Sequence, residues 1–294
     1  MHLGSIKTIC KTVEYWSRLK CPILDVYGLS RSLLATGTLI TLLFSSNDTY
    51  FPQLFFYKMK RGGQMIPNFF YLFEHQNLLH AKIIATIIML LVLIGYLPKL
   101  TCWLHWWVTY SFFTGSLLVD GGDQISVILT LFLIPICLIS NKSNHWLKKI
   151  NENINPYANL FLWSLLFVIQ MQMSCLYLNA AVAKFNSVHW SEGGAVYYWF
   201  NHNIFGASNW LKVVLGFIFD NKYTCFAISW SVMIVEMLLF AAWFMNTKNK
   251  YLCFILGIIF HIVIIFVHGL ASFFFAMAGG LVLYLLPFSQ PLNK

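Results

Sequence analysis

Charged residues are scarce in this chain, and their scarcity excludes an ordinary soluble domain. Asp, Glu, Lys and Arg make up 10% of the 294 residues, whereas hydrophobic residues make up 59%. Soluble domains contain roughly a quarter charged residues and about half apolar residues. The chain also lacks Ser- or Pro-rich linkers and internal repeats, so we expect one domain. The lipid bilayer must therefore be the main solvent of this protein.

Cysteine spacing excludes another group of functions. The seven cysteines are scattered, and neighbouring ones stand at least 11 positions apart, which is not the spacing of a zinc site or a redox pair. We therefore expect no metal, and we interpret the cysteines as small hydrophobic residues of helices. A cleavable signal peptide is not expected either, because the first apolar run begins only after Gly28.

Eight apolar segments are long enough to cross a bilayer, which takes about twenty helical residues each. They lie near 28–45, 79–97, 102–119, 123–140, 158–183, 224–245, 251–269 and 271–287. This pattern predicts an all-α fold, a polytopic integral membrane bundle of about eight transmembrane helices. We expect one transmembrane domain over 28–287, a cytoplasmic N-terminal segment over 1–27 and a cytoplasmic tail over 288–294.

The net charge of +9 is explained by membrane topology, and we expect no nucleic-acid partner. Eight spans place both termini on one side, and cytoplasmic loops carry an excess of Lys and Arg. With the termini inside, eleven such residues lie in inner segments and six in outer ones, namely Lys58, Lys60, Arg61, Lys184, Lys212 and Lys222. We therefore predict a multi-pass protein of the cell membrane with cytoplasmic termini. The two long outer loops, 46–78 and 184–223, are aromatic and should lie in the interface or fold back over the bundle.

Ionisable residues at membrane depth are costly and indicate functional sites. Glu236 falls near the middle of the sixth segment and His261 near the middle of the seventh, with His268 further along the same face. A buried structural pair between Glu236 and His261 is the alternative interpretation. Asp120 and Asp123 stand at the start of the fourth segment, where solvation or helix capping is the simpler explanation.

A polar stripe runs along the fifth segment. Gln170, Ser174, Tyr177, Ala181 and Lys184 follow offsets of 0, 4, 7, 11 and 14, so they share one helix face. Such a stripe among Phe, Leu and Met residues must face other helices or a cavity. Lys184 either extends its ammonium group to the interface or borders a polar pocket in the outer half of the bundle. Composition and spacing name no reaction for that pocket.

The segment 179–200, NAAVAKFNSVHWSEGGAVYYWF, resembles a family signature. Lys184 is followed six positions later by Trp190 and then by a Gly-x-Ala sequence that begins at Gly193. This pattern resembles the horizontally transferred transmembrane domain, whose best-known member is vitamin K-dependent gamma-carboxylase. The Lys, Trp and Gly spacing is the most specific part of the resemblance.

Other parts of the chain resemble the same family. Stretches around Arg31, Glu236 and His261 are similar to it, so the resemblance covers about 28–287. The chain length, the lack of an added extracytoplasmic domain and the YYW sequence at 197–199 look most like the bacterial sporulation-delaying protein B-like branch. Members of that branch work with a small partner in maturing a secreted peptide toxin.

The resemblance implies roles for particular residues. In the carboxylase the family's lysine is held to deprotonate reduced vitamin K, which makes Lys184 the candidate catalytic base here, and His261 the group that stabilises or relays charge. An amine held out of water loses its proton more readily, which suits a base. The pocket candidates are Glu236, His268, Trp190, Gly193 and Tyr177. The cofactor is unknown, and a reduced quinone such as vitamin K is suggested by the resemblance alone.

These features favour a gamma-carboxylase-like membrane enzyme, or the membrane component of a maturation complex, that acts on a secreted toxin-like peptide at the extracytoplasmic face. The predicted topology independently places Lys184 and His268 on that face. The alternative is a non-catalytic scaffold, immunity factor or export component, for which Lys184 and His261 would be dispensable or would matter only in folding. A transporter with a proton relay through Glu236 is less favoured, because the sequence has no inverted repeat.

Overall fold

The computed structural model describes residues 14–15, 18–19, 21–62, 66–147, 154–203 and 205–287. The predicted tail at 288–294 and most of the first twenty residues lie outside this range. Six helices within it are long and apolar enough to cross a membrane. The protein is therefore an all-α, polytopic membrane helix bundle, as the sequence predicts.

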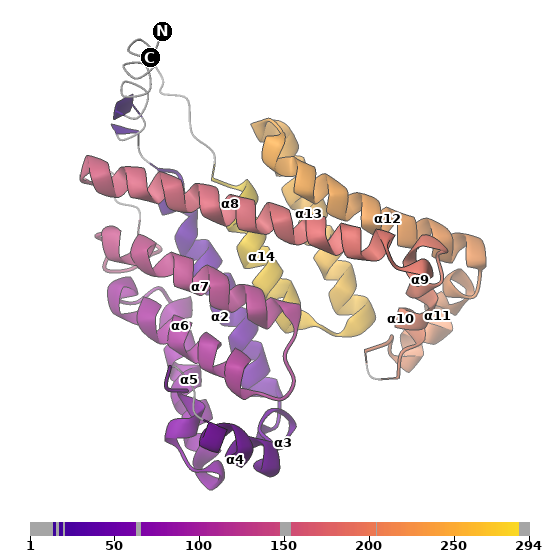
Figure 1. Cartoon of the computed structure of the whole chain (residues 1–294), viewed down its shortest axis with the longest axis horizontal. Helices are drawn as coiled ribbons and strands as arrows, with labels where there is room; N and C mark the ends of the chain where they lie inside the picture. The colour runs from indigo at the N-terminus through magenta and orange to yellow at the C-terminus, as the bar shows by residue number, and fades with distance from the viewer. Residues whose placement is uncertain are drawn as a thin grey trace.

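Eight helices correspond to the eight predicted segments (Figure 1). They are α2 (Ile23–Phe44), α5 (Leu78–Leu93), α6 (Pro98–Gly115), α7 (Gly121–Ile139), α8 (Pro156–Phe185), α12 (Lys222–Ala241), α13 (Thr247–His268) and α14 (Ala271–Leu285). Helix α2 begins at Ile23, earlier than the predicted start at residue 28, and the charged Asp25 in its first turn interrupts the apolar run from which that start was predicted. Two of the eight, α6 and α14, are not among the six long spans, and α14 has only 15 residues.

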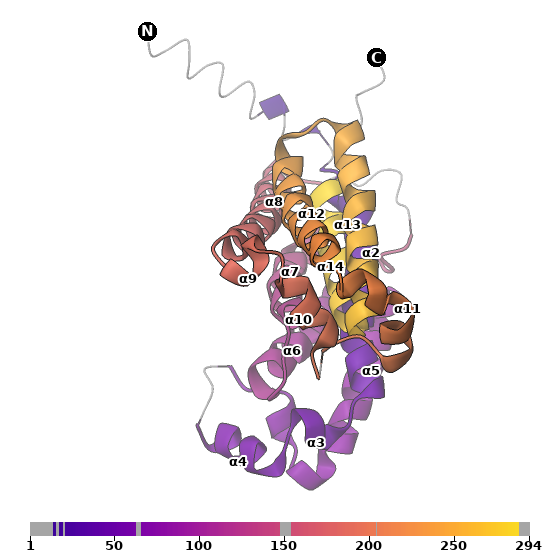
Figure 2. The same cartoon turned by 90° about the vertical axis from the view of Figure 1, so that its right-hand side faces the viewer.

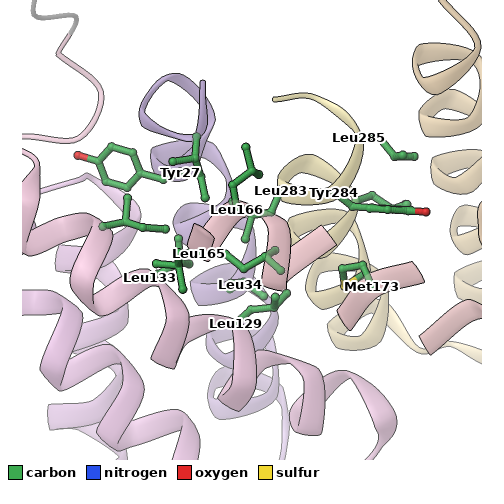
Figure 3. Packing of buried hydrophobic residues seen from close by; sticks show 14 of the residues in the cluster. Tyr27, Leu34, Leu129, Leu133, Leu165, Leu166, Met173, Leu283, Tyr284 and Leu285 are labelled. Carbon is green, nitrogen blue, oxygen red and sulfur yellow. The ribbon is translucent and has the colours of Figure 1, made fainter. Parts of the chain in front are cut away.

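Although α14 is short, it forms the centre of the bundle. Every residue from Ala276 to Leu285 is buried, and the helix packs against α2, α7, α8 and α13. Small residues let α2 approach closely, since Gly279 lies against Leu34 and the hydroxyl of Ser30 donates to the Gly279 carbonyl at 2.9 Å. Figure 3 shows the side chains that α2, α7, α8 and α14 contribute to this core, among them Leu34, Leu129, Leu133, Leu165, Leu166, Met173 and Leu283.

The outer surface of the long helices is apolar. On α13, the side chains of Ile255, Ile259, Val263 and Phe266 are exposed and recur at helical spacing. An exposed apolar stripe of this length has no favourable contacts in water but matches the acyl chains of a bilayer. This face of α13 therefore contacts lipid in the membrane.

The connecting segments gather at two opposite ends of the bundle. Near the start of α2, the hydroxyls of Tyr27 and Ser140 lie 3.0 Å apart, which joins this end to the end of α7. At the other end, the Leu117 amide donates to the Tyr50 carbonyl, and the first residues of α7 and α14 meet at Gly121 and Phe273. We call this second end the loop-rich end.

Both long connections lie on this side of the bundle, as two separate groups (Figures 1 and 2), and contain short helices that the sequence did not reveal. They are α3 (Asn47–Tyr50), α4 (Gln53–Gly62), η1 (Phe70–Leu72) and η2 (His75–Asn77) in the first, and α9 (Val188–Ser191), α10 (Ala195–Asn201) and α11 (Asn209–Phe219) in the second. A further turn, η3 (Ala242–Phe244), follows α12. Such short helices depend on tertiary packing more than on local propensity, which is why they leave a weak sequence signal.

Asp120 and Asp123 form a capping box at the start of α7. The Asp120 carboxylate accepts from the amides of Gly122 at 2.7 Å and Asp123 at 3.0 Å, while the Asp123 carboxylate accepts from the Asp120 amide at 3.1 Å. These bonds satisfy amides that have no partner within the helix. The capping interpretation of both aspartates is confirmed.

Candidate functional site

The polar stripe of α8 faces α12 and α14, as its spacing predicts. The side-chain amide of Gln170 donates to the Tyr284 carbonyl at 3.1 Å, and the Ser174 hydroxyl donates to the Phe240 carbonyl at 3.1 Å. One turn further on, Tyr177 is almost completely buried. The stripe thus joins three helices and leads from the core toward the loop-rich end.

At the end of this stripe, Lys184 forms an ion pair with Glu236 of α12. Lys184 Nζ lies 2.7 Å from Glu236 Oε1, and the two side chains are 21% and 7% exposed. The same nitrogen is 3.4 Å from the Ala180 carbonyl oxygen. A contact this short between a cation and a carboxylate is a charge-assisted hydrogen bond. The ammonium group is therefore turned toward α12, with one side still open to the surroundings of the helix end.

His261 lies deeper in the bundle, on α13. Its Nδ1 is 2.7 Å from the Gly257 carbonyl oxygen, and a carbonyl only accepts, so Nδ1 carries the proton and Nε2 is left as an acceptor. Its ring stands edge-on to Tyr177, with 6.2 Å between ring centres. The alternative pairing of Glu236 with His261 is not what the structure shows, because the carboxylate is held by Lys184 and the imidazole by its own helix.

Two buried polar atoms beside these residues lack a hydrogen-bond partner within the described part of the chain. They are the Tyr177 hydroxyl and Glu236 Oε2. Leaving a buried polar atom without a partner costs about 1–3 kcal/mol, so such atoms are normally satisfied by water or by a ligand. The inner side of the Lys184–Glu236 pair therefore keeps hydrogen-bonding capacity that no described residue uses.

A short turn holds an indole ring over the lysine. Lys184 Nζ is 5.3 Å from the centre of the Trp190 ring, within the range of a cation–π contact. Trp190 belongs to α9, and the residue after it is fixed to α12, since the indole N–H of Trp230 donates to the Ser191 carbonyl at 3.2 Å. The turn thus screens one side of the ion pair from solvent.

Gly193 makes this arrangement possible. Its φ angle is +84°, which favours glycine, and a Cβ atom there would stand 2.5 Å from the Cα of Phe226. The Ser229 hydroxyl donates to the Gly193 carbonyl at 3.2 Å. The glycine after the tryptophan is therefore needed both for its backbone conformation and for the close approach of the turn to α12.

The sequence analysis did not single out Ser229, although a signal was present. Ser229 precedes Glu236 by seven residues, so the two share a helix face, and both are buried. The same spacing argument that identified the stripe on α8 would have found it.

The structure brings together most of the predicted site residues. Lys184 contacts both Glu236 and Trp190, Tyr177 and His261 form a deeper layer, and Gly193 positions the tryptophan. His268 is the exception, because its Nδ1 lies 2.7 Å from the Phe205 carbonyl oxygen and its ring faces Trp199 at 6.2 Å. Those contacts join the end of α13 to the second outer connection.

Arg31 forms a second buried polar cluster, near the opposite end of the bundle. Its side chain is fully buried, and its two terminal nitrogens lie 3.2 Å from His145 Nδ1 and 3.0 Å from the Thr101 hydroxyl. A guanidinium group only donates, so His145 Nδ1 accepts and Nε2 carries the proton. That nitrogen is 3.1 Å from the Ser32 hydroxyl, which in turn donates to the Leu93 carbonyl.

The loop that carries His145 lies outside the spanning helices, between α7 and α8. Burial lowers the pKa of His145 to about 3, and the nearby charges of Arg31 and Lys142 act in the same direction. The imidazole is therefore neutral, which agrees with its acceptor role toward the guanidinium. This cluster fastens the loop to α2 and α6, and within the described residues Arg31 Nε is left without a partner.

Comparison with known proteins places the chain in a family. The sporulation-delaying protein SdpB of Bacillus subtilis (strain 168) is 34% identical over 294 residues, which cover 98% of this chain and 87% of SdpB. The chain belongs to the SdpB family. A second relative, the uncharacterized protein YitO of the same organism, is 30% identical over 292 residues that cover 98% of this chain and 93% of YitO.

Other comparisons give no further relatives. No protein-family model matches the chain, and no solved structure matches it. Membership of the SdpB family therefore rests on similarity along nearly the whole chain. The wider resemblance to the gamma-carboxylase transmembrane domain stays a prediction.

Proposed function

We propose that this member of the SdpB family is a membrane enzyme, or the membrane component of a maturation complex, that modifies a secreted toxin-like peptide at the extracytoplasmic face. Three observations support the proposal: the similarity to a protein named sporulation-delaying protein, the apolar helix bundle, and the polar cluster near the loop-rich end. The single observation that carries the catalytic part is the Lys184–Glu236 ion pair beneath Trp190.

The pair can act as a proton acceptor in spite of its charges. In water an ammonium–carboxylate pair is strongly favoured, but in a dry site its lost hydration is costly and a neutral amine beside a carboxylic acid becomes competitive. Movement of one proton across the 2.7 Å contact leaves Lys184 as a neutral amine and the proton on Glu236. A neutral amine next to bound substrate is a general base. Glu236 would thus hold the lysine in place and store its proton.

The gamma-carboxylase resemblance suggests a reduced quinone such as vitamin K as co-reactant. The Tyr177 hydroxyl and Glu236 Oε2, which have no partner among the described residues, are suited to hydrogen-bond the hydroxyl groups of such a molecule. Bound there, it would supply the strong base that the carboxylase chemistry requires. In this chain Lys184 would take the proton, and Trp190 would exclude water from one side.

The proposal also requires a membrane orientation. We infer a multi-pass protein of the cell membrane with both termini in the cytoplasm, so that the loop-rich end faces outward. The excess of Lys and Arg in the predicted inner segments supports this orientation. Asn203→Cys, in a background without reactive native cysteines, should be labelled by an impermeant reagent added outside. Labelling only after the inner face is opened would refute the orientation.

A non-catalytic scaffold, immunity or export role is the second candidate. The exposed aromatic side chains at the loop-rich end favour it, among them Tyr198, Trp199, Trp210 and Phe217. A surface of this kind can bind a peptide or a small membrane partner without changing it. This role predicts that charge at position 184 matters, whereas the ability to release a proton does not.

Mass spectrometry of the secreted peptide tests the proposal and separates the two roles. Peptide would be collected from cells with the protein, without it, and with an inactive variant of equal abundance. A mass that changes only with the wild-type protein identifies the reaction and supports the enzyme. An unchanged mass with less peptide outside the cell supports the scaffold or export role. Co-purification from the same membranes would show whether a small partner protein is bound.

A further inference from the structure

Helix α4 is held at the loop-rich end by one of its faces. Phe56 is fully buried, and its ring stands edge-on to that of Tyr71 with 5.0 Å between centres. One turn later, Lys60 Nζ is 2.9 Å from Glu74 Oε1 and 3.0 Å from the Phe73 carbonyl oxygen. An aromatic anchor and an ion pair on the same face fix how the helix is rotated about its axis.

The opposite face of α4 points outward and combines apolar and basic side chains. Leu54 is 87% exposed, and Lys58 and Arg61 are exposed one turn apart. With Gln53 and Tyr57 they line an open hollow on the surface. Helix α4 contains no Asp or Glu, so the helix itself offers these cations no counter-charge.

The position of α4 places this outward face where the membrane ends. The helix follows α2 closely and precedes α5, and both of these are candidate spans. A helix with a basic and apolar outer face at this level lies along the interface between headgroups and acyl chains. Leu54, which gains nothing by exposure to water, would there meet acyl chains.

We propose that the outward face of α4 binds an anionic phospholipid headgroup. Lys58 and Arg61 would bracket its phosphate, with the planar fork of the arginine making two bonds and the lysine acting as a point charge. Leu54 and Tyr57 would pack against the glycerol region and the first acyl carbons. A zwitterionic lipid also has a phosphate, but its quaternary ammonium group is repelled by two neighbouring cations. The face therefore selects anionic over zwitterionic lipid.

Helix α11, in the second outer connection, has by contrast an apolar outer face with a single cation. Its exposed residues include Trp210, Val213, Val214 and Phe217, with Lys212 as its one cation. This face suits acyl chains and carries no second cation with which to bracket an anion. The lipid preference should therefore belong to α4 and not to the loop-rich end as a whole.

Native mass spectrometry of the full-length protein with added lipid tests the proposal. The purified protein would be equilibrated with phosphatidylglycerol or phosphatidylcholine and the retained lipid counted for wild type, for Lys58→Gln with Arg61→Gln, and for Lys212→Gln with Lys222→Gln. Both double variants lose two charges from the same end. Each basic residue near an anionic surface contributes about a five-fold effect on affinity, so the α4 variant should bind phosphatidylglycerol roughly 25-fold more weakly. The α11–α12 control should bind it as wild type does, and phosphatidylcholine binding should be equal in all three.

Three outcomes would overturn the assignment. Undiminished phosphatidylglycerol binding by the α4 variant would show that the face is not a lipid site. An equal loss of phosphatidylglycerol affinity in the Lys212→Gln with Lys222→Gln variant would show that the effect comes from general surface charge. A glutamate-rich peptide would be added to the same proteins in a parallel measurement. If the α4 variant lost affinity for this peptide and not for phosphatidylglycerol, the face would belong to an acidic protein partner. Thermal unfolding that is unchanged in both variants excludes a folding defect as the cause.

Discussion

Two cations of the bundle, the fully buried Arg31 and the partly buried Lys184, have surroundings that differ in kind. Arg31 is fully buried, and both of its terminal nitrogens are bonded to neutral groups, His145 and Thr101. Lys184 keeps 21% of its side chain exposed and is paired with a carboxylate, Glu236, whose second oxygen has no partner within the described residues. Each cluster leaves a buried atom without a partner within the described residues, Arg31 Nε in the first and Glu236 Oε2 in the second, but only the second combines an unpaired acceptor with a partly exposed cation.

This difference separates a structural role from a functional one. Hydrogen bonds among buried groups rigidify the fold, and removing Arg31 leaves the groups that it bonds without this partner. An ion pair with a free acceptor and an exposed side can receive a proton or a ligand group, and it is less essential for packing. We therefore expect changes at Arg31 to act on stability and changes at Lys184 to act on peptide maturation.

The largest effect on stability is expected from Arg31→Ala. The substitution removes two hydrogen bonds and most of a fully buried side chain, which should lower the free energy of unfolding by about 3 kcal/mol or more. Thermal unfolding in detergent micelles measures this change. Arg61→Ala, which removes an exposed arginine, should leave the unfolding temperature within error. Equal unfolding temperatures of Arg31→Ala and Arg61→Ala would show that the Arg31 cluster does not stabilise the fold, and the distinction from the Lys184 cluster would be lost.

His261→Ala should act on activity instead. If the imidazole relays or stabilises charge in the pocket, its removal should slow peptide maturation by about 100-fold, the low end of general acid–base effects. The protein should still accumulate in the membrane. His268→Ala is the matched control, because His268 contacts the Phe205 carbonyl in the second outer connection and is not part of the Lys184 cluster. This substitution should slow peptide maturation much less. Similar losses in both variants would remove His261 from the site.

Gly193→Ala should have an intermediate effect. The positive φ angle alone costs a non-glycine residue roughly 1–2 kcal/mol, and the new methyl group would clash with the Phe226 backbone. The turn should shift and carry Trp190 away from Lys184, which lowers activity several-fold in the maturation assay. Gly194→Ala provides the control, since the nearest contact of its methyl group would be an ordinary 3.4 Å. Full activity of Gly193→Ala would show that the turn does not position Trp190.

The smallest expected effect is a pH dependence of the Arg31 cluster. The pKa of His145 is about 3 in the folded protein and ordinarily 6.5, so between these values the unfolded chain binds the proton more readily. Stability is thus fully present above about pH 6.5 and is lost as the pH falls toward 3. Between pH 6.5 and 5.5 the loss should reach about 1 kcal/mol. Thermal unfolding across this range should show it, and His145→Gln should flatten the profile. An equally steep profile in that variant would assign the effect to other groups.

Much of the fold follows from local sequence, whereas the pairing of residues within it does not. Apolar runs revealed the eight main helices, because each run is long enough to be read alone, and the spacing on α8 revealed which of its faces is polar. The partner of Lys184 lies 52 positions away and that of Arg31 lies 114 positions away. Such contacts depend on how each helix is rotated against its neighbours, which hydropathy does not record. Helices α4 and α11 were missed for a related reason, since packing rather than propensity stabilises them.

The central claim is that Lys184 acts as a base rather than as an anchor, and Lys184→Arg tests it most directly. Arginine keeps the charge, the long stem and a possible bond to Glu236, but it stays protonated at any ordinary pH. The decisive measurement is the mass spectrum of the secreted peptide from cells in which wild type, Lys184→Arg and Lys212→Arg are present at equal membrane abundance. The base model predicts mature peptide with wild type and Lys212→Arg and none with Lys184→Arg. Maturation by Lys184→Arg at the wild-type rate would contradict it and favour the scaffold role.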